Sequence, residues 1–150
     1  MIEVDVAGGA IPRLSKREVA EFARTAIAAI RRARAAPFTP SEVSIAFVDD
    51  EEMKRLNRRF RGRNRTTDVL TFPAGELPPL IDARLRPLGD IVISVPQARR
   101  QATAERHSLA REVRYLLLHG ILHALGYDHE TDQGVMNALE LRIRERLGLR

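Results

Sequence analysis

The chain has 150 residues, of which 44% are hydrophobic and 30% are charged, with a formal net charge of +5. This length and composition suit one globular domain that can bury a core, which we assign to residues 1–150. The absence of cysteine excludes disulfides and thiolate metal ligands. No apolar run approaches the ~18–20 residues that span a bilayer, and the N-terminus lacks the basic start and apolar centre of a signal peptide. We therefore expect a cytoplasmic protein without a membrane partner.

Strands and helices alternate through the first two thirds of the sequence, and helices follow. Ser15 with Glu18 three residues later is a capping box, and Pro96 suits the first turn of a helix. In chain order, periodicity predicts a strand over residues 2–6, a helix over 16–35, a strand over 43–48, a helix over 50–60, strands over 69–72 and 88–95, and helices over 96–105, 109–126 and 132–147, the last capped by Thr131 or Asp132.

These elements predict an α+β fold, with a mixed four-stranded sheet packed by about five helices. Strand–helix–strand units should make part of the sheet parallel. Residues 88–95 are nearly all apolar, which indicates a central strand. Residues 109–126 are apolar almost all round, so this helix should lie in the middle of the fold. The proline- and glycine-containing segment 74–87 is expected to be a surface loop.

Three of the four histidines lie close together in the sequence. His119 and His123 are four residues apart and share one face of the predicted helix. Gly126 is suited to end that helix, so that His129 lies in the returning segment. Three imidazoles with an open fourth position suit a catalytic zinc ion, which lowers the pKa of bound water towards ~7. The spacing predicts one zinc per chain, although another divalent ion is an alternative, and a hydrolase whose target bond stays open.

The residue after His119 argues against a peptidase. Zinc peptidases carry a glutamate there as general base, whereas this chain has Gly120. Gly120 either packs tightly on the sheet or allows another backbone or a substrate to approach. Asp128 either accepts a hydrogen bond from a ligand histidine or caps the turn. Asp128 and Glu130 could replace the missing glutamate only by an unusual geometry.

A basic run occupies residues 54–65, with seven Lys or Arg and no acid. Such a run is commonly a solvated face, but unbalanced arginines also suit a polyanion because guanidinium groups bind phosphate bidentately. Arg61, Arg63 and Arg65 lie in the predicted turn before the third strand. Phe60 is the one aromatic residue in the run, so no stacking platform for bases is evident, and phosphate-backbone binding is the favoured interpretation. With an open metal site, this indicates phosphodiester cleavage.

Four segments together resemble a known family. H-G-I-L-H-A-L-G-Y-D-H (119–129) resembles the H-G-x-L-H-L-x-G-Y-D-H signature of the YbeY family of bacterial metal-dependent endoribonucleases, also called rRNA maturation factors. L-N-R-R-F-R-G-R-N-R-T-T-D-V-L-T-F-P (56–73) and L-G-D-I-V-I-S (88–94) resemble two further family blocks, as does His107-Ser108 with Glu112. The sequence departs from the pattern at Asn64, Thr66, Arg106 and Ala124, none of which is a proposed ligand.

The resemblance implies an α+β fold with zinc on His119, His123 and His129, and cleavage of single-stranded RNA. It implies roles in 16S rRNA 3′-end maturation and in quality control of 70S ribosomes, with the ribosome or small-subunit proteins as partners and no DNA specificity. Arg61 falls on the position expected to contact RNA or shape the cleft, so Arg61 and His119 are the catalytic candidates. His107 is expected to be structural. The alternatives are a metal-dependent hydrolase of another bond, such as a peptidase, and a non-catalytic ribosome assembly factor with a structural metal.

Overall fold

The chain is described by a computed structural model over residues 2–62, 67–74, 85–128 and 130–149. Within these residues it forms a four-stranded sheet and five helices, which confirms the predicted α+β fold. The strands are β1 (Glu3–Gly8), β2 (Thr39–Pro40), β3 (Glu42–Val48), β4 (Val69–Pro73), β5 (Leu85–Arg86) and β6 (Gly89–Ser94). The helices are α1 (Lys16–Arg32), α2 (Asp50–Arg61), α3 (Val95–Glu105), α4 (Leu109–Ala124) and α5 (Val135–Arg146).

The main sheet has the order β1-β3-β6-β4 and is mixed. β1, β3 and β6 run parallel, whereas β4 is antiparallel to β6 and forms one edge. β6 is an interior strand, as its apolar sequence predicts: Ile91 and Ile93 belong to the main core, and Val92 belongs to a second one. A strand covered on both faces needs apolar side chains in both directions.

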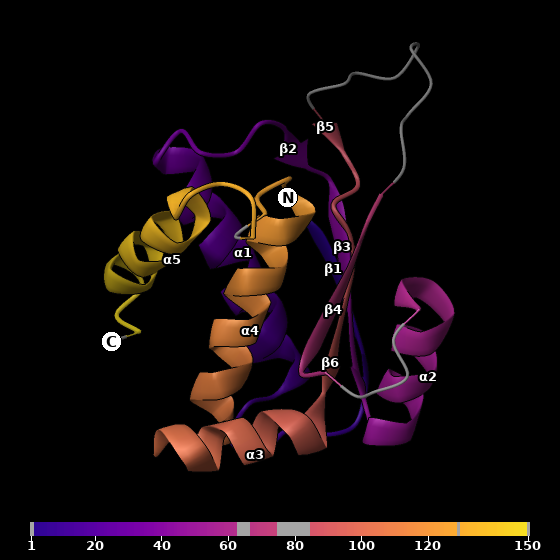
Figure 1. Cartoon of the computed structure of the whole chain (residues 1–150). Coiled ribbons are helices and arrows are strands. Elements are labelled where there is room, and N and C mark those ends of the chain that lie inside the picture. Colours follow the sequence, from indigo (N-terminus) through magenta and orange to yellow (C-terminus); the bar gives the residue numbers. More distant parts are fainter. Residues whose placement is uncertain (1, 63–66, 75–84, 129, 150) are drawn as a thin grey trace.

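The helices are divided unequally between the two faces of the sheet (Figure 1). α1, α4 and α5 cover one face and enclose the main core, α2 covers the other face, and α3 lies across the lower end. Met53, Leu70 and Val92 form the small second core under α2. α4 lies between the sheet and α5, which confirms that the histidine-bearing helix is central. No helix of the described residues is long and apolar enough to cross a membrane.

Glycine at position 120 places α4 directly on the sheet. A Cβ added there would lie 2.8 Å from Cγ2 of Ile91, a side chain of β6 with no exposed surface. Such a distance is closer than van der Waals contact, and neither group can move away easily inside a packed core. Of the two interpretations of Gly120, close packing on the sheet is therefore confirmed. This contact sets how far the two helix histidines stand from the sheet.

Several element ends differ from the prediction. α1 ends at Arg32 rather than near residue 35, and α5 begins at Val135, three residues later than predicted. Gly134, with φ of 91°, occupies the N-cap position of α5, so neither Thr131 nor Asp132 is the capping residue. The Asp132 carboxylate nevertheless accepts hydrogen bonds from the N–H groups of Gly134 and Met136. The acid thus supports the helix start from two positions upstream of the cap.

The short parallel pair β2–β5 was not predicted. Its two strands have only two residues each, and Pro40 lies in one of them. Strands are recognised from alternation over four or more residues, and proline, which cannot donate a backbone hydrogen bond, argues against a strand. The sequence of this pair therefore does not predict strands. It lies at the end of the segment 74–87, most of which falls outside the described residues.

Candidate functional site

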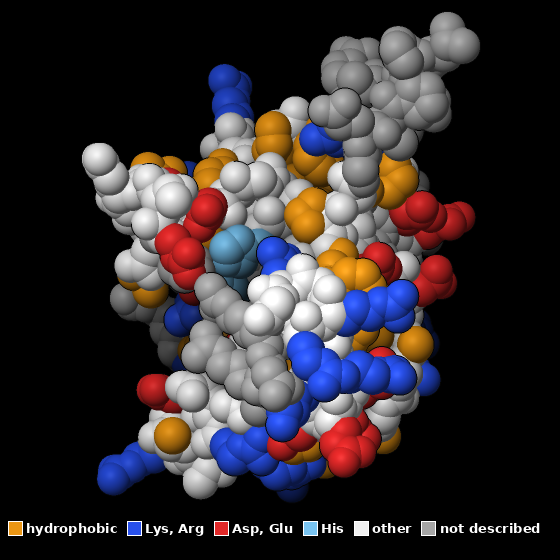
Figure 2. Space-filling view, turned by 45° about the vertical axis from the view of Figure 1, so that its right-hand side comes forward, with side chains coloured by type: hydrophobic (Ala, Val, Ile, Leu, Met, Phe, Trp, Pro, Cys, Tyr) orange, Lys and Arg blue, Asp and Glu red, His pale blue; other side chains and the backbone are white. Residues whose placement is uncertain are grey.

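His119 and His123 lie one turn apart near the C-terminal end of α4. Their ring centroids are 4.7 Å apart and the ring planes meet at 75°. Both side chains are partly exposed, on a helix whose other faces are largely buried. Gly126, with φ of 110°, follows the helix end and turns the chain back, as predicted. Figure 2 shows histidine side chains in a hollow of the surface with Lys or Arg side chains beside them.

His119 is held by a buried carboxylate from another helix. Its Nδ1 lies 2.7 Å from Oε1 of Glu140 on α5, a residue that is only 7% exposed. Arg144 donates from Nη2 to the other oxygen of Glu140 at 2.9 Å. A carboxylate at Nδ1 fixes the ring so that Nδ1 bears the proton and Nε2 bears the lone pair. This is the arrangement that a metal-ligating histidine needs.

The donor set fits a zinc ion as far as it is described. Two imidazoles from adjacent turns of one helix, one of them fixed by a carboxylate, are typical zinc ligands. The predicted third ligand, His129, lies outside the described residues. Among the residues that are described, no three His, Cys, Asp or Glu side chains come close enough together to hold a metal ion. The assignment of zinc to the three histidines therefore stays a prediction.

The two helix histidines open onto a cleft of about 910 Å³. One wall is formed by α4 and the following turn, with Gly126 and Tyr127, and the opposite wall by residues 67–73 around the edge strand β4. Tyr127 fastens the turn to the rest of the fold, since its hydroxyl donates to the carbonyl oxygen of Ala35 at 2.6 Å. The histidines therefore face the edge of the sheet across an open channel.

Arg61 lies on the far side of this cleft. It is the last residue of α2 rather than part of a free turn, and its Nη2 donates to the carbonyl oxygen of Thr71 on β4 at 2.6 Å. The side chain is exposed and lines the same cleft as His119 and His123. Sequence reasoning predicted an arginine near the site, and this one reaches it; Arg63 and Arg65 lie outside the described residues.

The basic run is less uniform than its sequence indicates. Arg55 is paired with Glu52, an acid one turn earlier in α2. Asp50, Glu51 and Glu52 occupy the first turn of the helix, so the positive charge is concentrated at its C-terminal end. That end is the one beside the cleft, and its cations also complement the helix dipole.

Asp128 acts within the turn after α4. Its Oδ1 accepts a hydrogen bond from the backbone N–H of Glu130 at 3.0 Å, which is the turn-capping alternative for this residue. Both acids line the cleft. Sequence reasoning missed Glu140, the carboxylate that contacts the His119 ring, and a role of Asp128 toward His129 stays a prediction because His129 lies outside the described residues. The signal was present: Glu140 lies among the buried positions Met136, Leu139 and Ile143 and so is an acid on the buried face of its helix.

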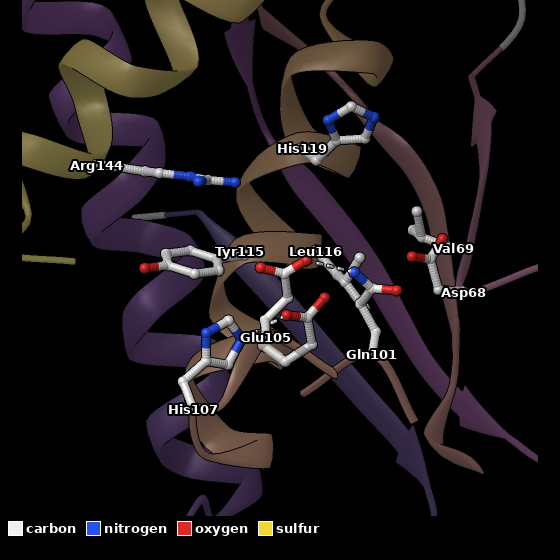
Figure 3. Close-up of a pocket in the computed structure, with 10 residues that line it drawn as sticks. Asp68, Val69, Gln101, Glu105, His107, Tyr115, Leu116, His119 and Arg144 are labelled. Atoms are coloured by element: carbon white, nitrogen blue, oxygen red, sulfur yellow. Dashed lines mark hydrogen bonds and ion pairs between the residues drawn. The ribbon is translucent and has the colours of Figure 1, made fainter. Parts of the chain in front are cut away.

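A smaller cavity of about 400 Å³ adjoins the cleft and shares His119 with it. Figure 3 shows Tyr115, Leu116 and His119 along α4, with Asp68 and Val69 opposite and Arg144 reaching in from α5. The Arg144 guanidinium carbon lies 3.9 Å from the centroid of the Tyr115 ring, so the arginine that supports Glu140 is itself held by an aromatic face.

His107 lines this smaller cavity, and its structural role stays a prediction. Its Nε2 lies 2.6 Å from Oε1 of Glu112, a buried acid in the first turn of α4. Ser108 caps the same helix by accepting from the N–H of Arg111. Arg106, where the family pattern has glycine, adopts a left-handed φ of 59° at the end of α3. The two helices are thereby joined by a tight corner.

Comparison with known proteins gives a consistent result. A family model described as "Endoribonuclease YbeY" matches residues 10–148. "Endoribonuclease YbeY" of Desulforamulus reducens is 50% identical over 113 residues, covering 73% of this chain and 74% of the relative. "Endoribonuclease YbeY" of Geobacillus thermodenitrificans is 45% identical over 130 residues, covering 80% and 83%. The solution structure of TM1509 from Thermotoga maritima superposes with a TM-score of 0.59 at 27% identity, over 97% of this chain and 89% of that one.

Proposed function

We propose a function from one premise: the chain belongs to the endoribonuclease YbeY family. The protein is a metal-dependent endoribonuclease, a hydrolase of phosphodiester bonds whose substrate is single-stranded RNA. Within that activity we assign it to 16S rRNA 3′-end maturation and to quality control of 70S ribosomes, with the ribosome or small-subunit proteins as partners.

One observation carries this proposal, namely a histidine pair, one ring of which is fixed by a carboxylate, facing an arginine across an open cleft. Glu140 fixes the His119 ring, and His123 follows one turn later on the same face. We propose that His119, His123 and His129 hold one zinc ion, or another divalent ion in its place. Such an ion would supply Lewis acidity to a phosphodiester bound beside it.

Arginine side chains of the protein would bind the phosphates of the RNA. The Arg61 guanidinium lines the cleft and has five N–H donors, one of which, on Nη2, donates to the Thr71 carbonyl oxygen. Arginine stabilises the charge of a phosphate by paired hydrogen bonds, so Arg61 is suited to hold the scissile phosphate opposite the histidines. The cations at the C-terminal end of α2 would bind the neighbouring phosphates.

The test incubates single-stranded rRNA fragments with the protein and with His119→Ala, purified in parallel to control for contaminating nuclease. We expect cleavage by the unaltered protein and none by the variant, together with about one zinc per chain that is lost from the variant. Metal analysis that finds no bound metal in carefully purified protein would refute the metal site.

The two alternatives give different results in the same experiment. A peptidase-like hydrolase would cleave unstructured peptides and leave RNA intact. A non-catalytic assembly factor would bind the rRNA fragments and keep its metal, and neither protein preparation would cleave them.

A further inference from the structure

Phe60 is an aromatic residue on the outside of the molecule. It is 55% exposed, on the last turn of α2. Val135 and Leu141 on α5 are the other large hydrophobic residues with comparable exposure in the described part of the chain. Single exposed apolar residues are ordinary, but those two are aliphatic and cannot stack on a planar ring. Phe60 differs from them in its chemistry and in its neighbours.

A second ring and one guanidinium group lie against Phe60, and a second guanidinium group lies against that second ring. The Phe72 ring on β4 packs edge-on against it, with centroids 5.3 Å apart and planes at 73°. The guanidinium carbon of Arg59 lies 5.3 Å from the Phe60 centroid, and that of Arg61 lies 5.8 Å from the Phe72 centroid. Phe72 comes from a strand rather than from the basic run, which is why the run by itself shows only one aromatic.

This aromatic pair is joined to the cleft through Arg61. The same arginine lies over the Phe72 ring, donates to the Thr71 carbonyl and lines the cleft with the helix histidines. Phe72 also packs on the second core, so the pair has a fixed base under an exposed ring. Neither ring lines the cleft itself, but Phe60 is the neighbour of Arg61 on the last turn of α2, so a strand that leaves the cleft past Arg61 would bring a base to Phe60. Figure 2 shows hydrophobic side chains next to Lys and Arg side chains on the face that bears the histidines.

We propose that Phe60, supported by Phe72 and flanked by Arg59 and Arg61, is a stacking site for one unpaired nucleobase. The inference rests on the proposed function, because it takes an RNA strand in the cleft as its starting point. Stacking of a base on an aromatic ring, with arginines on the adjacent phosphates, is how proteins bind single strands regardless of sequence. A paired base offers no open face, so the same site would select single-stranded RNA over duplex RNA.

The chain contains no tryptophan, which allows a direct optical test. Phe60→Trp introduces a single fluorophore at the proposed site, and Val135→Trp introduces one at a matched position, 57% exposed, on α5. Both changes are made in the His119→Ala background so that no cleavage occurs during the measurement. The probes are a short single-stranded oligoadenylate, the same strand paired with oligouridylate, and inorganic polyphosphate. Binding is followed separately by the anisotropy of a labelled probe.

We expect the single strand to quench the fluorescence of the Phe60→Trp variant strongly, the duplex to quench it weakly, and polyphosphate to bind without quenching. The fluorescence of the Val135→Trp variant should respond to none of them. Oligoadenylate that binds by anisotropy but leaves the Phe60→Trp fluorescence unchanged would overturn the stacking site and leave the proposed function standing. Equal quenching by polyphosphate would also overturn it, since that probe has no base. No binding of RNA by any variant would overturn the proposed function and the stacking site together.

Truncation and replacement of the ring give a second measurement. Phe60→Ala should weaken single-strand binding by roughly 5- to 150-fold, the range found when a stacking aromatic is removed. Phe60→Tyr, which keeps a ring face, should bind within about twofold of the unaltered protein. Circular dichroism checks that both variants fold, as is expected for a side chain that is half exposed. Equal affinity of the Ala and Tyr variants would contradict the proposal.

Discussion

The two walls of the cleft are built in opposite ways. On the α4 wall, the polar groups hold one another in a chain: His119 bonds Glu140, and Glu140 bonds Arg144, which rests on Tyr115. On the opposite wall, which β4 and the C-terminal end of α2 form together and which we call the α2 wall, Arg61 and the neighbouring cations of α2 are exposed, and Arg61 is tied to the protein by a hydrogen bond to a backbone carbonyl. The first wall holds atoms in place, and the second presents long side chains that can adjust.

The difference between a fixed and an exposed wall matches the role of each wall in the proposed function. A metal ligand must be held within fractions of an ångström. A hydrogen bond from the histidine ring to a buried partner achieves this because it fixes the orientation of the ring. A nucleic-acid strand varies in sequence and shape, and exposed arginines can follow its phosphates. Substitutions on the α4 wall should therefore act on metal binding and stability, and those on the α2 wall on RNA alone.

Charge reversal at Arg61 should have the largest effect on RNA. In Arg61→Glu, a carboxylate replaces the group that faces the scissile phosphate, and we expect cleavage to fall by about 10³-fold or more with bound metal unchanged. Metal analysis measures the bound metal, and cleavage of single-stranded rRNA fragments measures the activity. Lys16→Glu, a charge reversal at an exposed position on α1, serves as the control. Undiminished cleavage by Arg61→Glu would remove Arg61 from the site.

Glu140→Gln should reveal the opposite pattern. The amide keeps the shape of the carboxylate but loses the charge that orients the His119 ring, so metal affinity should fall by about 10–100-fold. Glu112→Gln is a matched control, because Glu112 is similarly buried and bonds a histidine, His107, that is no proposed ligand. Competition with a chelator of known affinity measures the metal affinity of each variant. Equal metal affinities of the two variants would show that the Glu140 contact is structural only.

Sequence patterns predicted the parts of this molecule that depend on periodicity. The apolar run 88–95 indicated the interior strand β6, and the spacing of His119 and His123 placed both on one helix face. Helix-ending residues were also informative, since Gly126 follows the end of α4 as expected. These features are local, and local rules are enough to find them.

The missed parts depend on contacts between distant segments. The pattern of α5 marks Glu140 as an acid on a buried face, but nothing near His119 indicates that this acid, 21 residues later, would reach its ring. Phe60 and Phe72 come from a helix and a strand, and only the folded chain joins them. The two interpretations of Gly120 could be separated only when Ile91 was found against it. Tertiary packing decides such pairings, and local sequence patterns carry no record of them.

Packing on the α4 wall is tested by Gly120→Ala. Overpacking against Ile91 costs about 1–3 kcal/mol, and the higher helix propensity of alanine returns about 1 kcal/mol, which leaves a net loss of up to about 2 kcal/mol. Thermal unfolding should show a midpoint lowered by up to about 8 °C, at about 2–4 °C per kcal/mol for a chain of this size. A raised midpoint would mean that α4 has room to move off the sheet, and the two walls would then differ less than their contacts indicate.

The smallest effect is expected for a single exposed cation on the α2 wall. Arg58 lies on the last turn of α2, and Arg58→Gln removes one positive charge while the metal site stays intact. If Arg58 contacts one phosphate, affinity for a single strand should fall only a few-fold, while the slope of log affinity against log salt becomes less steep by about 0.7. Arg17→Gln on α1, an arginine whose side chain is 88% exposed, should leave the slope unchanged. Equal slopes for both variants and the unaltered protein would place the RNA elsewhere. Because the slope counts phosphates and the Phe60→Trp fluorescence reports bases, the two measurements together separate what the arginines bind from what the aromatic ring binds.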